Sequence, residues 1–211
     1  MNYEHIRRQV LEAARRTADL GLIHGTSGNL SVREGEVFAI TPSGRPYGTM
    51  APEDVAIVTL AGEWIDGPYK PSSETPMHAA VYRARPDAGA VVHTHSLFCT
   101  VMAMACDALP LTTPPHAELS PVPAVPFALP GSGELAELVS AALKEGGRSV
   151  LLRNHGCLSL GRDMEGALTA AVYTEEAAQI AWHASLLGKL TPLTQEQIAA
   201  LRAVLGSGGA V

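Results

Sequence analysis

The sequence predicts a single α/β domain in which helices cover both sides of a mixed sheet. Apolar residues repeat with the spacing of a helix in some segments and with the alternation of a strand in others, and the two patterns follow one another along the chain. The 211 residues, of which 46% are hydrophobic, are enough to form one large core. No internal repeat and no linker divides the sequence, so we expect residues 1–211 to form one domain.

The expected helices are recognised by an apolar stripe and by residues that start or stop a helix. Residues 3–20 carry Ile6, Val10 and Ala14 on one face and are followed by Gly21. Ser72 and its neighbours look like a helix start, because serine caps well and proline is tolerated in a first turn. The same reasoning predicts helices at residues 72–85, 96–105, 133–144, 164–187 and 194–204.

The expected strands are short and lie between these helices. They cover residues 30–32, 37–40, 55–60, a return strand through Trp64, an apolar run that ends at His93 and His95, and residues 122–125, 150–152 and 158–160. Residues 109–131 hold seven prolines, so we expect this segment to be irregular or extended apart from its one short strand.

Charge and cysteine content narrow the class of protein. The net charge is −6 and no block of Lys or Arg occurs, which disfavours nucleic acid or an anionic membrane surface as a partner. Three cysteines without a CxxC motif suit a reducing compartment, and no signal peptide is recognised, so we expect a cytoplasmic protein. The apolar stretch at residues 167–187 is interrupted by Glu175, Glu176 and Gln179, which predicts a buried helix and no membrane span.

Two histidines at the end of a strand are the clearest functional signal. His93 and His95 are two residues apart. Because side chains alternate between the faces of a strand, both imidazoles lie on one face. Two neighbouring imidazoles form half of a zinc site, although polar residues at a strand end also occur for structural reasons alone.

Candidates for the remaining ligands lie elsewhere in the chain. Glu74 opens a predicted helix, and His155 lies in an Asn-His-Gly turn. Three histidines and one carboxylate would suit a catalytic zinc whose carboxylate can give way to substrate. Each residue also has an ordinary interpretation, since acidic residues favour a first helical turn and Asn-His-Gly favours a tight turn. His78, one helical turn after Glu74, either supports a ligand or packs in the core.

Three short loops rich in hydroxyl groups suggest a site for an anion. They are residues 25–29, residues 41–44, and Ser72 with Ser73 at a helix N-terminus. Glycine lets backbone N–H groups approach an anion closely, and a helix N-terminus with two hydroxyls is a ready anion site. Each loop alone would be an ordinary turn, and together they predict a phosphate cradle.

Five motifs in order resemble the class II aldolase/adducin family, from residue 1 to about 205. They are Gly25-Thr26-Ser27-Gly28-Asn29-Leu30-Ser31, Thr41-Pro42-Ser43-Gly44, Ser72-Ser73-Glu74, His93-Thr94-His95 and Asn154-His155-Gly156. Within that family the layout is most similar to the L-fuculose-1-phosphate aldolases. The resemblance implies an α/β/α sandwich around a mixed, mainly antiparallel sheet, and a homotetramer with active sites at the subunit interfaces.

The resemblance also implies roles for the site residues. One Zn²⁺ per chain, or another divalent metal, would be bound by Glu74, His93, His95 and His155. The substrate phosphate would be held by Thr26, Asn29, Ser43, Gly44, Ser72 and Ser73. The implied enzyme is a zinc-dependent aldehyde lyase that cleaves a ketose 1-phosphate to dihydroxyacetone phosphate and a small aldehyde. Zinc would act as a Lewis acid on the hydroxyketone oxygens, and Glu74 would leave the metal and shuttle a proton.

One departure from the family concerns the proton donor at the aldehyde end. The family's tyrosines have no counterpart in residues 111–116 or in residues 206–211. His116 and Glu118 are the only ionisable side chains of residues 108–133. We therefore predict that one of these two supplies the proton that the leaving aldehyde oxygen needs, unless both are solvated loop residues.

The motifs leave the reaction itself open. Residues 73–78 and the His116-Ala117-Glu118 segment resemble the L-ribulose-5-phosphate 4-epimerase branch, which has Asp where this chain has Glu74 and Glu118. Decarboxylases and dehydratases of sugar acids and thiosugars share the scaffold. A non-catalytic, adducin-like interaction domain is the alternative of another class, and the intact set of four ligands argues against it. In each catalytic case the expected partner is a small phosphorylated sugar.

Overall fold

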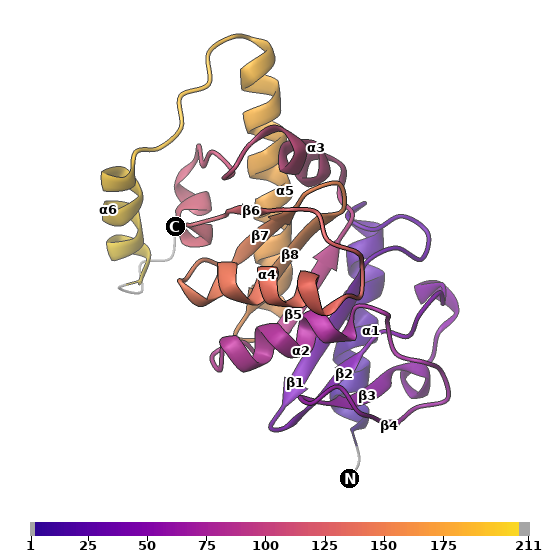
Figure 1. Ribbon diagram of the computed structural model, residues 1–211. Helices are drawn as coiled ribbons and strands as arrows, with labels where there is room; N and C mark the ends of the chain where they lie inside the picture. Colours follow the sequence, from indigo (N-terminus) through magenta and orange to yellow (C-terminus); the bar gives the residue numbers. More distant parts are fainter. Residues whose placement is uncertain (1–2, 207–211) are drawn as a thin grey trace.

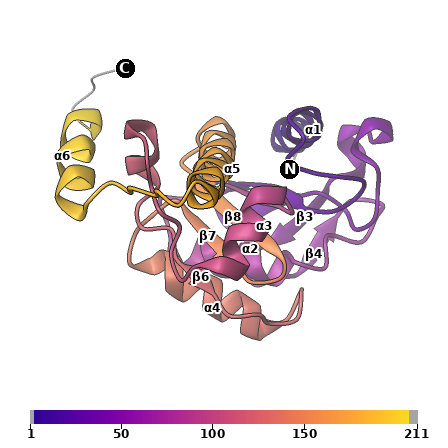
Figure 2. The ribbon, with the colours of Figure 1, turned by 90° about the horizontal axis from the view of Figure 1, so that it is seen from above.

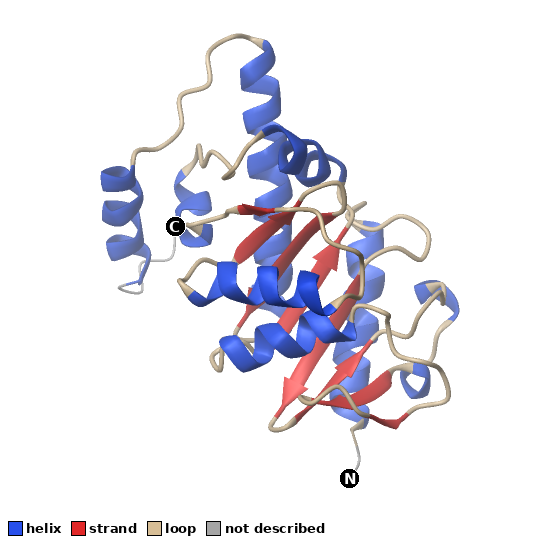
Figure 3. Cartoon of the chain, viewed as in Figure 1, coloured by secondary structure: helices blue, strands red, loops and turns tan. Residues whose placement is uncertain are grey.

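The strands among residues 3–206 pair into one eight-stranded sheet, shown in red in Figure 3. The structure is a computed structural model that describes residues 3–206. The strands are β1 (Asn29–Glu34), β2 (Val37–Ile40), β3 (Ala56–Thr59), β4 (Trp64–Asp66), β5 (Ala90–Thr94), β6 (Ala124–Val125), β7 (Ser149–Leu152) and β8 (Gly156–Gly161). Their order is β4-β3-β2-β1-β5-β8-β7-β6, and β6 pairs with β7 in parallel while the other pairings are antiparallel. The prediction of a mixed, mainly antiparallel sheet is confirmed.

Helices cover both faces of this sheet (Figure 1). They are α1 (Glu4–Asp19), α2 (Thr75–Ala84), α3 (Leu97–Ala105), α4 (Gly133–Lys144), α5 (Met164–Leu186) and α6 (Gln195–Gly206), with short 3₁₀ helices η1 (Tyr47–Thr49), η2 (Pro52–Asp54) and η3 (Pro114–Leu119). Seen from above, α1 and α5 lie on one side of the sheet, and α2 and α4 lie on the other (Figure 2). The predicted α/β/α sandwich is therefore the observed architecture.

Strand β5 shows why both faces of the sheet are buried. Its neighbouring residues Val91 and Val92 point to opposite faces, and each is fully buried in a different core. Val92 packs in the core shared with α1 and α5, whereas Val91 packs in the core shared with α2 and α4. A strand covered on both faces is apolar throughout, which explains the unbroken apolar run before the histidines.

The helix that follows β5 is fixed by a carboxylate from a distant part of the sequence. Glu175 of α5 accepts hydrogen bonds at 2.8 Å from the backbone N–H groups of Phe98 and Cys99, in the first turn of α3. These N–H groups have no partner within their own helix. Glu175 thus has a structural role within the long apolar stretch, and no helix among residues 3–206 is long and apolar enough to cross a membrane.

Two segments differ from the sequence-based expectation. The second helix begins at Thr75, so Glu74 precedes the helix and does not lie inside it. Residues 114–119, expected to be irregular or extended, form η3, because Pro114 and Pro115 occupy its first positions, where no N–H is needed. Residues 207–211, part of the segment compared with the family's C-terminal tyrosine, lie outside the described residues.

Candidate metal and anion site

The centre of the sheet brings the predicted ligands together. Asn29 of β1 lies directly opposite His93 of β5, and Thr94 lies opposite Cys157 of β8. His155 lies in the three-residue turn between β7 and β8, where Asn154 adopts a left-handed conformation with φ of 57°. Asparagine tolerates this conformation better than most residues, so the turn can point His155 back toward β5.

The three imidazole rings are arranged around a common centre. The ring centroids of His93, His95 and His155 are 4.8–4.9 Å apart in every pairing, and the ring planes meet at 69–71°. The three rings are therefore related by an approximate threefold arrangement. One ligand atom from each ring and from Glu74 all lie within 4.8 Å of one another. This is the predicted group of three histidines and one carboxylate, assembled from three separate parts of the chain.

A backbone carbonyl sets the protonation of His93. The Nδ1 atom lies 2.8 Å from the carbonyl oxygen of Cys157, and a carbonyl can only accept, so Nδ1 carries the hydrogen. Nε2 of the same ring then faces the cluster, 3.0 Å from Nε2 of His95. This is the orientation in which a histidine commonly holds a metal. Gly156 lets the start of β8 lie close to the end of β5, because a Cβ there would lie 2.2 Å from the carbonyl oxygen of Thr94.

The carboxylate of Glu74 completes the cluster and is itself buried. Its Oε2 lies 2.9 Å from Nε2 of His93 and also accepts a hydrogen bond at 2.9 Å from the amide of Asn29. Its Oε1 lies 3.3 Å from Nε2 of His155 but has no hydrogen-bond partner, although the atom is buried. A buried carboxylate oxygen without a partner is costly, and a cation between the rings would remove that cost.

The charges in the cluster also suit a divalent cation. Burial alone would raise the pKa of Glu74, but the attraction and hydrogen bonds of His93 and Asn29 hold this pKa well below its usual range. Burial, followed by the charge of His93, lowers the pKa of His95 and of His155 to about 4. Burial opposes charge on His93 as well, but Glu74 outweighs it and raises the pKa of His93. His95 and His155 are therefore neutral and Glu74 is ionised, which are the forms that bind a divalent cation. A bound cation would displace the proton of His93.

The three hydroxyl-rich loops border the same cluster. A cavity of 230 Å³ is lined by Thr26, Ser27, Gly28, Asn29, Pro42, Ser43, Gly44, Ser72, Ser73, Glu74, His95, Pro130 and His155. All six residues predicted to hold a phosphate are among them. Asn29 and Ser72 are buried, whereas the other four are exposed. The structure therefore joins the two motif groups that the sequence suggested separately.

Backbone contacts hold two of these loops against each other. Pro42 and Pro71 form an isolated antiparallel bridge. The N–H of Ser43 donates to the carbonyl of Lys70 at 3.0 Å, and the N–H of Ser72 donates to the carbonyl of Thr41 at 3.1 Å. The two loops therefore form one rigid rim beside Glu74.

Comparison with known proteins assigns this arrangement to a family. The Class II Aldolase and Adducin N-terminal domain matches residues 8–182. A 5-methylthioribulose-1-phosphate/5-deoxyribulose-1-phosphate aldolase of Rhodospirillum rubrum is 40% identical over 84% of this chain and 80% of its own length. An L-fuculose phosphate aldolase of Haemophilus influenzae is 34% identical over 98% of this chain and 94% of its own length. A solved L-fuculose 1-phosphate aldolase covers 98% of both chains with 29% identity and a TM-score of 0.93.

The chain belongs to the class II aldolase and adducin family. The curated relatives are aldolases, so the prediction of an enzyme of the aldehyde-lyase class is confirmed. Class II aldolases use a divalent metal, and the cluster of Glu74 with three histidines is compatible with one.

The two residues predicted as proton donors lie outside the cavity of this class II aldolase. His116 of η3 is buried, and its Nε2 lies 3.3 Å from a carboxylate oxygen of Glu176 on α5. Glu118 is exposed and pairs with Arg148 at 3.2 Å. Neither is among the residues that line the 230 Å³ cavity. The structure therefore gives both residues other partners within the chain.

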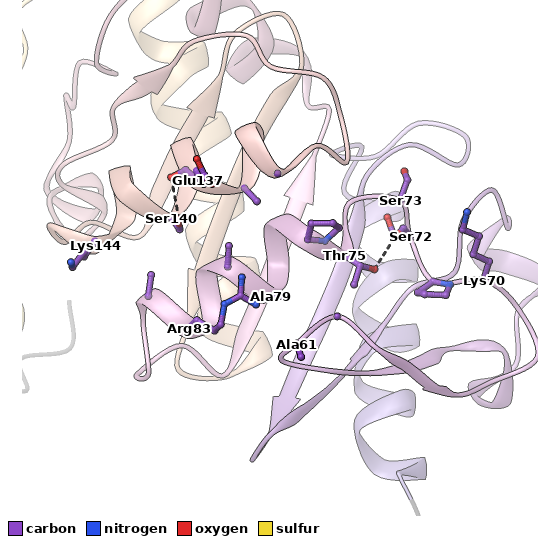
Figure 4. Close-up of a pocket in the computed structure, with 17 residues that line it drawn as sticks. Ala61, Lys70, Ser72, Ser73, Thr75, Ala79, Arg83, Glu137, Ser140 and Lys144 are labelled. Carbon is purple, nitrogen blue, oxygen red and sulfur yellow. Dashed lines mark hydrogen bonds between the residues drawn. The ribbon is translucent and has the colours of Figure 1, made fainter.

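A larger hollow lies between α2, α4 and the loops before α2 (Figure 4). Its volume is 940 Å³, and Ser72 and Ser73 lie at its border with the smaller cavity. Lys70, Arg83 and Lys144 stand along it. The metal-ligand group found among residues 3–206 adjoins the smaller cavity and not this hollow. The smaller cavity is therefore the candidate active site.

Sequence reasoning left the role of His78 open, and the structure gives this residue a specific place. His78 is fully buried, and its Nε2 lies 2.6 Å from Oδ1 of Asn29, whose amide nitrogen in turn donates to Glu74. The spacing of Glu74 and His78 by four residues was the available signal, because residues four apart share a helix face. Asn29, assigned to the phosphate from the sequence, thus also contacts the carboxylate.

Proposed function

We propose that this chain cleaves a ketose 1-phosphate by a retro-aldol reaction, giving dihydroxyacetone phosphate and a small aldehyde. One observation carries the proposal: a cluster of three histidines and a carboxylate opens into the cavity that the three hydroxyl-rich loops border. A substrate with a phosphate at one end and a hydroxyketone next to it has the chemistry to contact both parts at once.

A divalent ion, for which we propose Zn²⁺ at one per chain, would be held by Glu74, His93, His95 and His155 and would stabilise the negative charge that develops on the substrate oxygens. Glu74 is the residue that we propose to move the proton at the carbon that becomes part of dihydroxyacetone phosphate. Its position supports this role, because the Glu74 carboxylate lines the cavity beside the proposed metal and has one oxygen, Oε1, without a hydrogen bond.

The phosphate would be bound by neutral donors. We assign it to Thr26, Asn29, Ser43, Gly44, Ser72 and Ser73, all of which line the cavity. Exposed hydroxyls and backbone N–H groups can surround an anion without a lysine or arginine. Fixing the phosphate would hold the bond to be cleaved at the metal, so these contacts contribute orientation as well as affinity.

The names of the relatives support the substrate class. One is an aldolase of 5-methylthioribulose 1-phosphate and 5-deoxyribulose 1-phosphate, and others are aldolases of L-fuculose phosphate. We therefore propose a ketose 1-phosphate of the fuculose or 5-deoxyribulose type. We further propose a cytoplasmic homotetramer in which His116 or Glu118 supplies the aldehyde-end proton at the site of a neighbouring subunit, since neither lines the cavity of its own chain. Glu118 is exposed and would act directly, whereas the buried His116 would act through Glu176, whose side chain is 53% exposed.

The reaction is tested with zinc-loaded protein in a coupled assay for dihydroxyacetone phosphate. L-fuculose 1-phosphate and 5-deoxyribulose 1-phosphate are the substrates, and chelator-treated protein is the control. We expect product from at least one substrate, loss of product after chelation, and recovery when zinc is returned. The epimerase alternative would replace the proposal if no ketose 1-phosphate gave product while L-ribulose 5-phosphate was turned over.

A further inference from the structure

A chain of buried hydrogen bonds runs from Glu74 into the core between α2 and the sheet. Asn29 donates to Glu74 at 2.9 Å, and Nε2 of His78 lies 2.6 Å from Oδ1 of Asn29. Nδ1 of His78 lies 2.7 Å from Oγ of Ser31, which lies 2.7 Å from the hydroxyl of Tyr82. All five side chains are buried, with exposed fractions of 5% or less.

The positions of these residues follow from helix and strand periodicity. Glu74, His78 and Tyr82 are spaced by four residues, so the residue that caps α2 and two residues within the helix lie along one face. Asn29 and Ser31 are spaced by two residues, so they lie on one face of β1. The helix face and the strand face alternate along the chain of bonds, and each link joins one to the other.

The carboxylate at one end fixes the direction of every bond. An ionised Glu74 can only accept, so the amide nitrogen of Asn29 must face it and Oδ1 must face His78. Oδ1 can only accept, so Nε2 of His78 carries a hydrogen. In a neutral imidazole Nδ1 is then an acceptor, Ser31 donates to it, and Tyr82 donates to Ser31.

The surroundings support these protonation states. Burial, and after it the charge of His93, lowers the pKa of His78 to about 3, so the ring is neutral. Burial raises the pKa of Tyr82, so its hydroxyl keeps the proton that it donates. Both side chains are fully enclosed, and the hydrogen-bond partners of the His78 ring, Asn29 and Ser31, are uncharged.

We propose that His78, Ser31 and Tyr82 are positioning residues that act on Glu74 through Asn29. They hold the Asn29 amide in the one orientation that donates to Oε2 of Glu74 and leaves Oε1 open toward the histidines. Asn29 keeps a second N–H for the substrate anion, so both of its roles are compatible. No proton needs to travel along the chain, because its effect is orientation and polarisation of the carboxylate. The catalytic part of this inference rests on the proposed aldolase function.

The bond direction can be tested without any activity measurement. In zinc-loaded protein labelled with ¹⁵N-histidine, NMR should show His78 as a neutral ring with the hydrogen on Nε2. Tyr82→Phe, which removes only the terminal hydroxyl, should shift the Nδ1 resonance of His78 because Ser31 loses the bond that polarises it. An Nδ1–H tautomer or an imidazolium at His78 would overturn the inference, whatever the protein does to ketose phosphates.

The kinetic arm uses His78→Leu, His78→Gln and Tyr82→Phe. Loss of a partner that orients a metal ligand typically costs ~10–100-fold, so we expect His78→Leu to lower kcat by that factor with little change in KM. His78→Gln can still donate to Asn29 and should recover most of kcat, and Tyr82→Phe should give a smaller loss. Ser149→Ala is the matched control, because Ser149 of β7 is a buried hydroxyl outside this chain of bonds that contacts Ser159 of β8 and Thr174 of α5. Wild-type kcat in both His78→Leu and Tyr82→Phe would contradict the proposal.

Discussion

Two histidine–carboxylate pairs share a buried imidazole but differ in the burial of the carboxylate and in what surrounds them. His93 lies 2.9 Å from Glu74, and His116 lies 3.3 Å from Glu176. Both imidazoles are fully buried. The side chain of Glu74 is only 6% exposed, whereas that of Glu176 is 53% exposed. Two further histidines and a cavity adjoin the first pair, and no other metal-ligand group was found among the described residues.

The two histidines also respond to their carboxylates in opposite ways. Glu74 overcomes the effect of burial and raises the pKa of His93. For His116, burial exceeds the attraction of Glu176 and the pKa is lowered. Solvent screens an exposed carboxylate, so it stabilises a neighbouring positive charge less than a buried one does. A buried histidine–carboxylate pair is therefore a candidate site where metal-binding side chains from several elements converge on it.

The largest effect should come from removing two ligands of the first pair's cluster. We expect a His93→Ala, His95→Ala variant to lose its metal and its lyase activity. Loss of an outer partner already lowers metal affinity ~10–100-fold, and loss of two direct ligands should exceed this. Elemental analysis after dialysis against a weak chelator measures the metal content.

His116→Gln is the matched control for this experiment, because it alters the second histidine–carboxylate pair. Its metal content should equal that of the wild type. Full occupancy in the double variant, or metal loss in the control, would contradict the distinction drawn between the two pairs.

The first pair could be predicted from the sequence because its signals are local. The HxH spacing on an apolar strand, the Asn-His-Gly turn and the acidic helix start are each readable within a few residues, and their order resembles a family. The sheet and most element bounds follow from similar short-range patterns. The assembly of the cluster then depends only on the family fold.

The second pair could not be predicted in the same way. Glu176 lies 60 residues after His116 and reaches it only because α5 packs on η3. The partners of Asn29 are likewise 45 and 49 residues away, across the contact between β1 and α2. The capping of α3 by Glu175 also joins distant segments. Side-chain contacts of this kind depend on tertiary packing, which no local period encodes.

The next largest effect tests whether η3, which carries His116 and Glu118, takes part in catalysis. If His116 or Glu118 donates the aldehyde-end proton to a neighbouring subunit, one of His116→Gln and Glu118→Gln should lower kcat by ~10²–10⁴-fold with metal content unchanged. Steady-state kinetics alongside metal analysis provides this measurement.

Mixed oligomers show whether the donor acts across an interface. Refolding the inactive donor variant together with the His93→Ala, His95→Ala variant should restore part of the activity, since some sites then receive a metal from one chain and a donor from the other. Wild-type kcat in both single variants would assign the proton to water or to another residue.

The smallest effect concerns the anion loops, which border the cavity beside the first pair. Ser73→Ala should raise the KM for a ketose 1-phosphate ~10-fold or more, because hydrogen bonds to charged groups contribute about 1.5–3 kcal/mol. Ser73 is a better choice than Ser72, whose hydroxyl also accepts a hydrogen bond from the N–H of Glu74 at 3.2 Å.

Ser140→Ala, in the larger hollow of Figure 4, is the matched control and should leave KM unchanged. The unphosphorylated ketose supplies the second comparison, since its KM should hardly respond to either variant. Equal changes for the phosphorylated and unphosphorylated sugars would mean that Ser73 shapes the cavity without binding the phosphate.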